Sequence, residues 1–185
     1  MTIKEVQPRI RQFRYRQEKG DPDYGTCLWA HFNLDTENYT LSIESDCGSY
    51  SYGWTPTPNS ESFVHLMSRV NDVYLLEKIA DRDVFDYGES KKQTIENIKE
   101  YFDGDEETIS AILSEIEFHE CMGDIYSDSH EFYRIIEMFL EEHNCCDIFE
   151  TIAVEMDYNA GAKRIVKIFR EVLQPILKKE CEDRP

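Results

Sequence analysis

The chain has 185 residues, of which 41% are hydrophobic and 12% aromatic, and its formal net charge is −18. This length fits one domain, or one domain with a small appendage, and the content of large side chains excludes a fibre or a wholly disordered acidic chain. The acidic residues must therefore lie on the surface of a folded body.

The N-terminal stretch MTIKEVQPRIRQFRYR lacks the apolar segment of a signal peptide, and no apolar run approaches the roughly 20 residues that span a bilayer. We therefore expect a cytoplasmic protein without a membrane partner. Its six cysteines are then expected to be reduced thiols.

Alternation of side chains predicts β-strands in the first third of the chain. Every second side chain is apolar over residues 28–34 and 39–45, and Tyr and Trp alternate with small residues over 49–54. Gly48 fits the left-handed position of a hairpin loop between the last two of these strands. A three-stranded antiparallel meander is expected, which residues 9–16 would extend to four strands.

After residue 60 the apolar residues recur at helical spacing, beginning with a helix that Ser60 or Ser62 can cap. Asp103-Gly104-Asp105 should end one helix and cap the next. Pro175 should kink or end the regular part of a last helix over roughly 161–180. The main predicted stripes are Phe63, Leu66, Met67 and Val70; Leu75, Leu76 and Ile79; Ile95, Ile98 and Phe102; Ile109, Ile112, Leu113 and Ile116; Phe132, Ile135, Ile136, Phe139 and Leu140; and Ile165, Ile168, Phe169, Val172, Leu173 and Ile176.

These elements predict an α+β fold, in which an N-terminal antiparallel sheet of three to four strands is followed by a mostly helical, acidic C-terminal part. Residues 1–58 would form the meander, and residues 59–185 would form the helical part packed on it. The two parts are expected as one domain or as two closely associated subdomains.

The charge is unevenly distributed along the chain. Residues 101–160 contain 17 acidic side chains and a single basic one, Arg134. Asp105, Glu106 and Glu107 fall at the start of a predicted helix, where the helix dipole favours negative charge. Helix physics therefore explains part of the acid, and the candidate partner-binding residues are Asp103, Asp105, Glu106, Glu107, Glu115, Glu117, Glu137, Glu141 and Glu142.

Carboxylates on a rigid helical scaffold can imitate the phosphates of a nucleic acid and occupy the basic groove of a protein that binds one. Alternatively, the same residues are a solvated surface that keeps the protein soluble. The density of acid favours a use beyond solubility, because self-repulsion of this kind destabilises a compact fold.

Histidine and cysteine residues offer an alternative site. Imidazole and thiolate are ligands that zinc prefers, and His119 and Cys121 together with His143, Cys145 and the adjacent Cys146 could supply four. Their spacing matches no standard zinc motif, and cysteine is commonly a small buried hydrophobic residue. A metal-binding protein, or an enzyme that uses these residues, is therefore the alternative hypothesis to a protein that acts through its acidic surface without a metal.

Basic residues gather near the N-terminus, where Arg9, Arg11, Arg14 and Arg16 interleave with aromatic side chains. Such a pattern can bind nucleic acid. In so acidic a chain we favour pairing with the protein's own acidic residues or with those of a second copy, which leaves a homodimer open.

Aromatic residues alternate over the last predicted strand, at Tyr50, Tyr52 and Trp54, and Trp29 lies in an earlier strand. An exposed row of this kind would be a binding hot spot in a general protein-interaction module. We favour the other interpretation, in which the row is a sheet face packed beneath helices.

Catalytic motifs are missing from the sequence, which has no glycine-rich phosphate loop, no GxSxG and no HExxH. We therefore expect no catalytic residue, no cofactor and no enzymatic activity.

A longer pattern over residues 32–102 combines an acidic turn, a Leu-x-Ile strand, Ser-Asp-x-Gly, alternating aromatics and a Phe-x-x-Leu helix. It resembles proteins encoded by phages and prophages. The residues that carry the resemblance are Asp35, Leu41, Ile43, Ser45, Asp46, Gly48, Tyr50, Tyr52, Trp54, Phe63, Leu66, Tyr74, Leu75 and Lys78.

The resemblance implies an inhibitor of host defence, a class that includes anti-CRISPR proteins, acting in the cytoplasm of the host cell. The expected partner is a basic host protein that binds nucleic acid, such as a CRISPR effector, and no direct contact with nucleic acid is expected. Because the resemblance ends at residue 102, it implies that the acidic helical part is an addition to the shared region.

Overall fold

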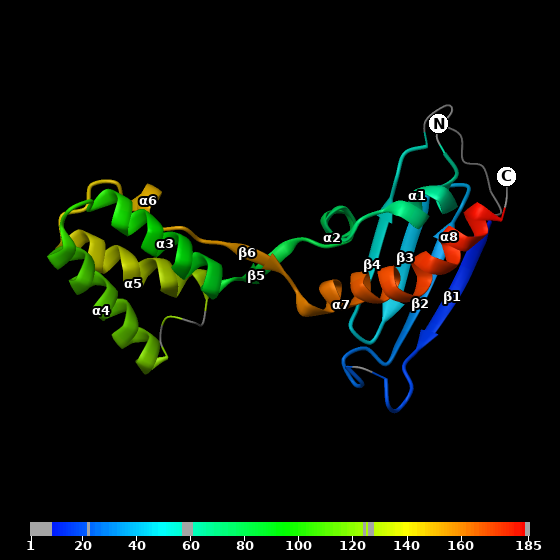
Figure 1. Cartoon of the computed structure of the whole chain (residues 1–185), viewed down its shortest axis with the longest axis horizontal. Coiled ribbons are helices and arrows are strands. Elements are labelled where there is room, and N and C mark those ends of the chain that lie inside the picture. Colours follow the sequence, from blue (N-terminus) through cyan, green and yellow to red (C-terminus); the bar gives the residue numbers. More distant parts are fainter. Residues whose placement is uncertain (1–8, 22, 57–60, 124, 126–127, 184–185) are drawn as a thin grey trace, which may run out of the picture. The chain divides into compact units, whose positions relative to one another are not determined.

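The computed structural model describes residues 9–21, 23–56, 61–123, 125 and 128–183 (Figure 1). The chain forms two compact units, of which unit 1 comprises residues 1–82 and 158–185, and unit 2 comprises residues 83–157. Unit 2 is therefore an insertion into the chain of unit 1. This division differs from the boundary at residue 58 that the sequence pattern predicts, because the first and last helices belong to the same unit as the sheet.

Unit 1 contains a four-stranded antiparallel sheet. Its strands are β1 (Ile10–Arg16), β2 (Trp29–Asp35), β3 (Thr40–Ser45) and β4 (Gly48–Gly53), and their spatial order equals their order in the chain. The predicted meander, with its fourth strand, is confirmed. Gly48 has a φ of +127°, so the turn between β3 and β4 uses the backbone freedom of glycine.

One face of the sheet forms the core of unit 1. The alternating residues Ala30, Phe32 and Leu34 of β2 are buried, and Tyr50 and Tyr52 of β4 pack against the same core together with Trp54. The interpretation of the aromatic row as a packed face is confirmed. Leu28 is instead 41% exposed because β2 begins only at Trp29, whose ring lies on the opposite face beside His31.

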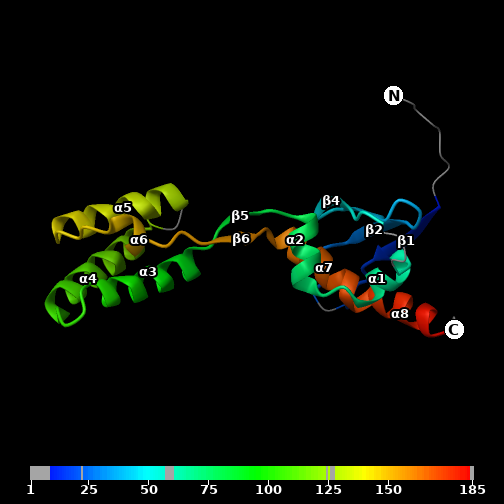
Figure 2. The same cartoon turned by 90° about the horizontal axis from the view of Figure 1, so that it is seen from above.

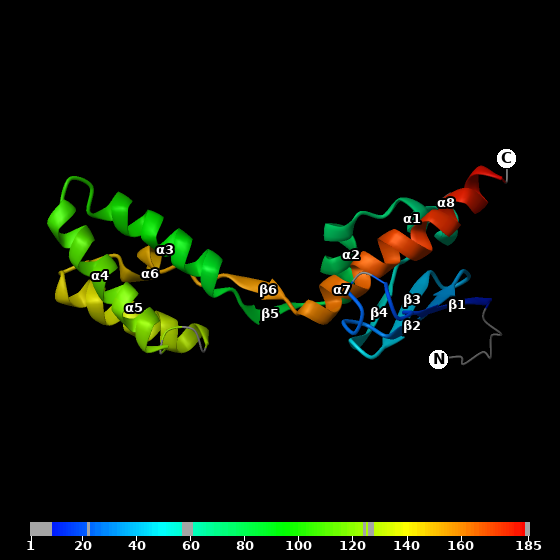
Figure 3. The ribbon, with the colours of Figure 1, turned by 60° about the horizontal axis from the view of Figure 1, so that its bottom comes forward.

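Helices cover that buried face of the sheet and leave the other face open within unit 1 (Figures 2 and 3). They are α1 (Phe63–Arg69), α2 (Asp72–Ile79), α7 (Ala160–Ile168), a π-helical segment η1 (Phe169–Leu173) and α8 (Gln174–Glu182). The side chains of Ser62, Asn71 and Asn159 cap α1, α2 and α7.

α7, η1 and α8 follow one another directly as a single C-terminal helix, but the hydrogen-bonding pattern changes from α-helical to π-helical within η1. Pro175 lacks a backbone N–H, and the chain accommodates it near the start of α8, directly after the π-helical segment η1. The expected interruption at Pro175 therefore takes the form of a wider turn. The apolar side of this region, including Ile165, Phe169 and Leu173, is buried against the sheet.

Unit 2 is helical. Its elements, with the short two-stranded ribbon through which the chain enters and leaves it, are β5 (Arg82–Phe85), α3 (Tyr87–Tyr101), α4 (Glu106–Met122), α5 (Ser129–Glu142), α6 (Ile148–Thr151) and β6 (Met156–Tyr158). The two short strands are not predicted by the sequence, because β6 has only 3 residues and neither strand shows a clear alternation.

The core of unit 2 is formed by the predicted apolar stripes of α4 and α5. Asp105 caps α4 as expected, and Gly104 before it has a φ of +82°. Asp128 caps α5, because its side chain accepts hydrogen bonds from the backbone N–H groups of His130 and Glu131. The buried side chains are Ile98, Ile112, Ile116, Ile125, Phe132, Ile135, Ile136, Phe139, Leu140, Cys145 and Ile152.

Candidate functional site

The net charge of the protein resides entirely in the segment that forms unit 2. Residues 83–157 contain 22 acidic and 4 basic side chains, which gives a formal net charge of −18. The remainder of the chain contains 16 acidic and 16 basic side chains, so its formal net charge is zero. The acid is thus concentrated on one small helical body and is not a general property of the surface.

The start of α4 carries four of the predicted partner-binding residues, Asp103, Asp105, Glu106 and Glu107, all of them exposed. Asp105 accepts a hydrogen bond of 3.1 Å from the backbone N–H of Thr108. Hydrogen bonding from the Thr108 side chain and from its backbone N–H holds the pKa of the Asp105 carboxyl below its ordinary value, and the nearby imidazole of His143 adds to the effect.

The end of α5 lies at the same end of unit 2 as the start of α4 (Figures 1 and 3). His143, whose imidazole acts on Asp105, follows directly after Glu141 and Glu142, and both glutamates are exposed. The antiparallel arrangement of α4 and α5 therefore brings residues almost forty positions apart to one place. We call this group the acidic end, and it consists of Asp103, Asp105, Glu106, Glu107, Glu141 and Glu142.

The other predicted residues do not share one face. Glu115 and Glu117 are both exposed on α4, but residues two positions apart on an α-helix differ by about 200° in direction, so these two point to opposite sides. Glu137 is half-buried on α5. The structure thus gathers six of the nine predicted residues and distributes the other three around the unit.

Basic side chains within unit 2 neutralise little of this charge. Lys91 pairs with Glu120 at 2.6 Å, Lys92 with Glu89 at 2.9 Å, and Arg134 with Glu131 at 2.6 Å. None of these glutamates is among the nine predicted residues. Within the described parts of the chain, none of the nine makes an ion pair.

Exposed apolar side chains accompany the carboxylates on α4, and the sequence analysis missed them. Phe118 is 57% exposed and Met122 is 62% exposed. With Glu115 they are spaced by three and four residues, so they share one side of the helix away from the core. The sequence does contain a pattern that indicates these two residues, because Phe118 and Met122 are spaced by four residues and lie outside the predicted core stripe of α4.

The histidines and cysteines of the alternative site are not brought together. His119 contacts the rings of Phe118 and Phe139, while Cys121 is exposed. His143 bonds to the carbonyl of Phe139, and Cys145 is buried with its sulfur 3.7 Å from the Thr151 hydroxyl. Over the described residues, the one group of three or more metal-ligating side chains with mutually close ligand atoms is Cys27, Asp46 and Cys47 in unit 1.

Two of the arginines near the N-terminus pair with acidic residues of unit 1 itself. Arg9 lies 3.9 Å from Glu37, and Arg11 pairs with Glu180 of α8. Arg14 and Arg16 make no ion pair in the described residues, and with Trp29 and His31 they line a shallow cavity of about 510 Å³ on the sheet.

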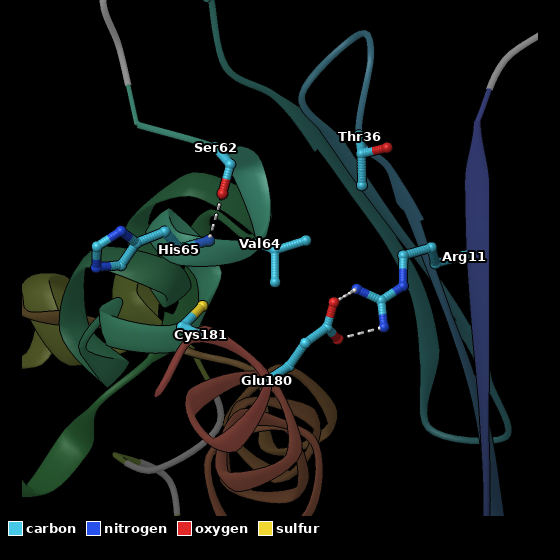
Figure 4. Close-up of a pocket in the computed structure, with 7 residues that line it drawn as sticks. All are labelled: Arg11, Thr36, Ser62, Val64, His65, Glu180 and Cys181. Atoms are coloured by element: carbon cyan, nitrogen blue, oxygen red, sulfur yellow. Dashed lines mark hydrogen bonds and ion pairs between the residues drawn. The ribbon is translucent and has the colours of Figure 1, made fainter. Parts of the chain in front are cut away.

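A cavity of about 540 Å³ in unit 1 lies between β1, α1 and α8 (Figure 4). Arg11 donates two hydrogen bonds to Glu180, of 3.1 and 2.7 Å. Ser62 accepts a hydrogen bond from the backbone N–H of His65, so its hydroxyl serves as a helix cap. The polar groups of this cavity thus hold β1 to α8 and cap α1; its residues are Arg11, Thr36, Ser62, Val64, His65, Glu180 and Cys181.

The fold and the charge define an α+β protein that carries a strongly acidic helical insertion. A family model described as a phage family, Phage_phiTE_072, matches residues 1–179, and the chain belongs to this family. The match extends through both units, so the acidic part is not an addition to the shared region, as the resemblance over residues 32–102 implied. No curated protein and no solved structure matches the chain.

In the described parts of the chain, no helix combines the length and the apolar character that crossing a membrane requires.

Proposed function

We propose that this phage protein inhibits a host defence protein that binds nucleic acid, and that it does so by placing the acidic unit 2 in the partner's basic groove. The observation that carries the proposal is the charge partition, with −18 on residues 83–157 and zero on the remainder. A protein that needs net negative charge only for solubility has no reason to confine that net charge to one unit.

The mechanism is competition. A basic groove that normally holds phosphates attracts a carboxylate surface over long range, and Lys and Arg side chains then form charge-assisted hydrogen bonds with individual carboxylates. The acidic end provides six carboxylates that make no ion pair in the described residues, and of these Asp105 also caps α4. A CRISPR effector is a host protein of the required kind.

The apolar side chains of α4 fit a protein partner. Interfaces between proteins combine charged rims with a few well-buried apolar anchors. Phe118 and Met122, next to Glu115, can act as such anchors beside the carboxylates. Partner binding would then consist of electrostatic attraction that sets the rate of association and of apolar contact that slows dissociation.

The partner is best sought by capture from cells that contain a CRISPR effector, with and without guide RNA. Capture that guide RNA abolishes would place the acidic unit in the nucleic-acid groove. Capture that guide RNA leaves unchanged would place it elsewhere on the effector and would contradict the competition mechanism.

The electrostatic mechanism is tested by two variants of equal charge. One variant replaces Glu106, Glu107, Glu141 and Glu142 by Gln. The control replaces four exposed acidic residues of unit 1 by the corresponding amides, Gln or Asn; they are Glu44, Glu77, Asp81 and Glu182. Gln is chosen because a lysine in the first turn of α4 would oppose the helix dipole.

Both variants have the same net charge, so only the position of the change differs. We expect the first to weaken partner binding about tenfold or more and to reduce its dependence on salt, while the control binds as the unchanged protein does. Equal losses in the two variants, or binding that does not weaken as salt rises, would show that the acidic end is not the contact surface.

A further inference from the structure

Two cysteines and an aspartate of unit 1 meet at one end of the sheet. Cys27 precedes β2 by two residues, and Asp46 and Cys47 form the turn between β3 and β4. The two sulfur atoms and a carboxylate oxygen all lie within 4.8 Å of one another. Strand pairing between β2 and β3 produces this meeting, because it aligns Ala30 with Ser45 and so brings the flanking residues together.

Asp46 is held in a fixed orientation. Its carboxylate accepts hydrogen bonds from the backbone N–H of Leu28 at 2.9 Å and from that of Trp29 at 3.2 Å. A carboxylate that is oriented by outer hydrogen bonds is typical of a metal ligand.

Cys27 is completely buried, and its thiol donates a hydrogen bond to Oδ1 of Asp46, with Sγ and Oδ1 3.4 Å apart. Tetrahedral zinc with bonds of about 2.3 Å to sulfur and about 2.0 Å to oxygen would hold these two atoms about 3.5 Å apart. The observed separation therefore suits a shared cation.

Cys47 is partly exposed, and its backbone is fixed by neighbouring elements. Tyr50 donates a hydrogen bond of 3.0 Å to the carbonyl oxygen of Cys47. Gly161 of α7 approaches the same carbonyl so closely that a Cβ atom there would lie 2.1 Å from it. The turn that carries two of the three potential ligands is thus positioned by contacts outside the cluster.

Asp46 and Cys47 also line an open cavity of about 660 Å³, to which Lys163, Arg164 and Lys167 of α7 contribute. Two thiolates and one carboxylate around a divalent cation carry a net charge of −1. The basic side chains, of which Arg164 and Lys167 also pair with Asp23, would offset that charge. The cavity provides space for a fourth ligand, such as water.

We infer that Cys27, Asp46 and Cys47 form a zinc site with three protein ligands and a fourth position open to the cavity. The site ties the start of β2 to the turn between β3 and β4. It is independent of the proposed function of unit 2, and it uses none of the histidines and cysteines that the sequence pattern singled out as metal ligands. Binding releases the protons of the two thiols to solvent.

The full-length protein tests this inference when it is purified under reducing conditions and its zinc content is measured. We expect about one zinc ion per chain, and on replacement by cobalt(II) an absorption band of thiolate-to-cobalt charge transfer. The variant Cys47→Ser should lose both signals. The matched control Cys146→Ser changes an exposed cysteine of unit 2 and should keep them.

The cobalt band of the unchanged protein is a readout that does not depend on any variant, and the fluorescence of Trp29 and Trp54 reports whether Cys47→Ser still folds unit 1. Absence of both zinc and the cobalt band from the reduced protein would overturn the inference. So would zinc that survives in Cys47→Ser, or isolation of the protein from cells with Cys27 and Cys47 already joined in a disulfide.

Discussion

Gly161 is the second residue of α7, and it lies against the carbonyl oxygen of Cys47. Because a Cβ atom would fall 2.1 Å from that backbone oxygen, Gly161→Ala must displace either the helix or the turn. We expect it to destabilise unit 1 by about 1–3 kcal/mol. Unfolding in urea, followed by tryptophan fluorescence, measures this change.

Gly88 provides the matched control, since it is the second residue of α3 and an added Cβ there would meet only a side-chain oxygen at 3.5 Å. Gly88→Ala should leave the stability of unit 2, which is followed by hydrogen exchange of its amides, unchanged or raise it by up to about 1 kcal/mol. A loss of similar size in both variants would mean that the close contact of Gly161 is not the cause.

The environment of Glu120 is expected to make the stability of unit 2 depend on pH. Burial alone would raise its pKa, but hydrogen bonds from Lys91 at 2.6 Å and Tyr87 at 2.5 Å lower it below the ordinary value of 4.5. A lowered pKa in the folded state contributes stability above the unfolded-state pKa. That stability is lost as the pH falls through the lower, folded-state value.

Glu120→Gln should therefore destabilise unit 2 most near pH 7, and the difference from the unchanged protein should shrink below about pH 4.5. Hydrogen exchange of unit 2 amides over a pH series measures it. Glu117→Gln is the control, because Glu117 is exposed on the same helix and should change stability little at any pH. A difference for Glu120→Gln that persists unchanged at pH 3 would contradict this explanation.

At the scale of elements, polar side chains of α3 form hydrogen bonds with the backbone of the chain segment before β6, as the backbone of a neighbouring strand would. These side chains are spaced by four and three residues along α3. Ser90 accepts from the N–H of Glu155 at 2.8 Å, and Thr94 both accepts from the N–H of Ala153 and donates to its carbonyl. Asn97 donates to carbonyls further back in the segment.

Thr94→Val keeps the shape of the buried side chain but removes both hydrogen bonds to Ala153. We expect it to destabilise unit 2 by about 1–3 kcal/mol, because backbone groups lose their partner. Hydrogen exchange of the Ala153 amide and of the α3 amides measures the effect. Ser114→Ala, an exposed change on α4, should stay within about 0.5 kcal/mol; an equal loss there would argue against the hydrogen-bond explanation.

At the scale of the whole molecule, the two units should respond differently to salt. Repulsion among 22 acidic side chains with 4 basic ones destabilises unit 2, and salt screens it, whereas unit 1 is balanced. Raising sodium chloride from about 10 mM to about 500 mM should stabilise unit 2 by on the order of 1 kcal/mol and change unit 1 much less.

The chain offers separate probes for this comparison. Its two tryptophans, Trp29 and Trp54, both belong to unit 1, so their fluorescence follows that unit alone. Hydrogen exchange of the amides of Ile112 and Ile136 follows the core of unit 2. Equal shifts in the two probes would show that the charge partition does not govern stability.

Local patterns determined much of the fold. Alternation around Phe32 and Ile43 predicts both strands and their buried face, and Asp105 predicts the start of α4, because strand faces and helix caps depend on near neighbours. The concentration of acid is likewise a property of sequence. These features needed no knowledge of the tertiary structure.

Only the tertiary structure decided which apolar faces meet and which distant residues become neighbours. An apolar stripe such as that of Ile165 and Phe169 predicts that one side of a helix is buried. It does not predict which element the helix packs against, because the hydrophobic effect is not directional. The sequence therefore placed the helical part after residue 58 as one body, whereas α7 and α8 return to the sheet. For the same reason the acidic end and the cluster of Cys27, Asp46 and Cys47 appear only once the chain has folded.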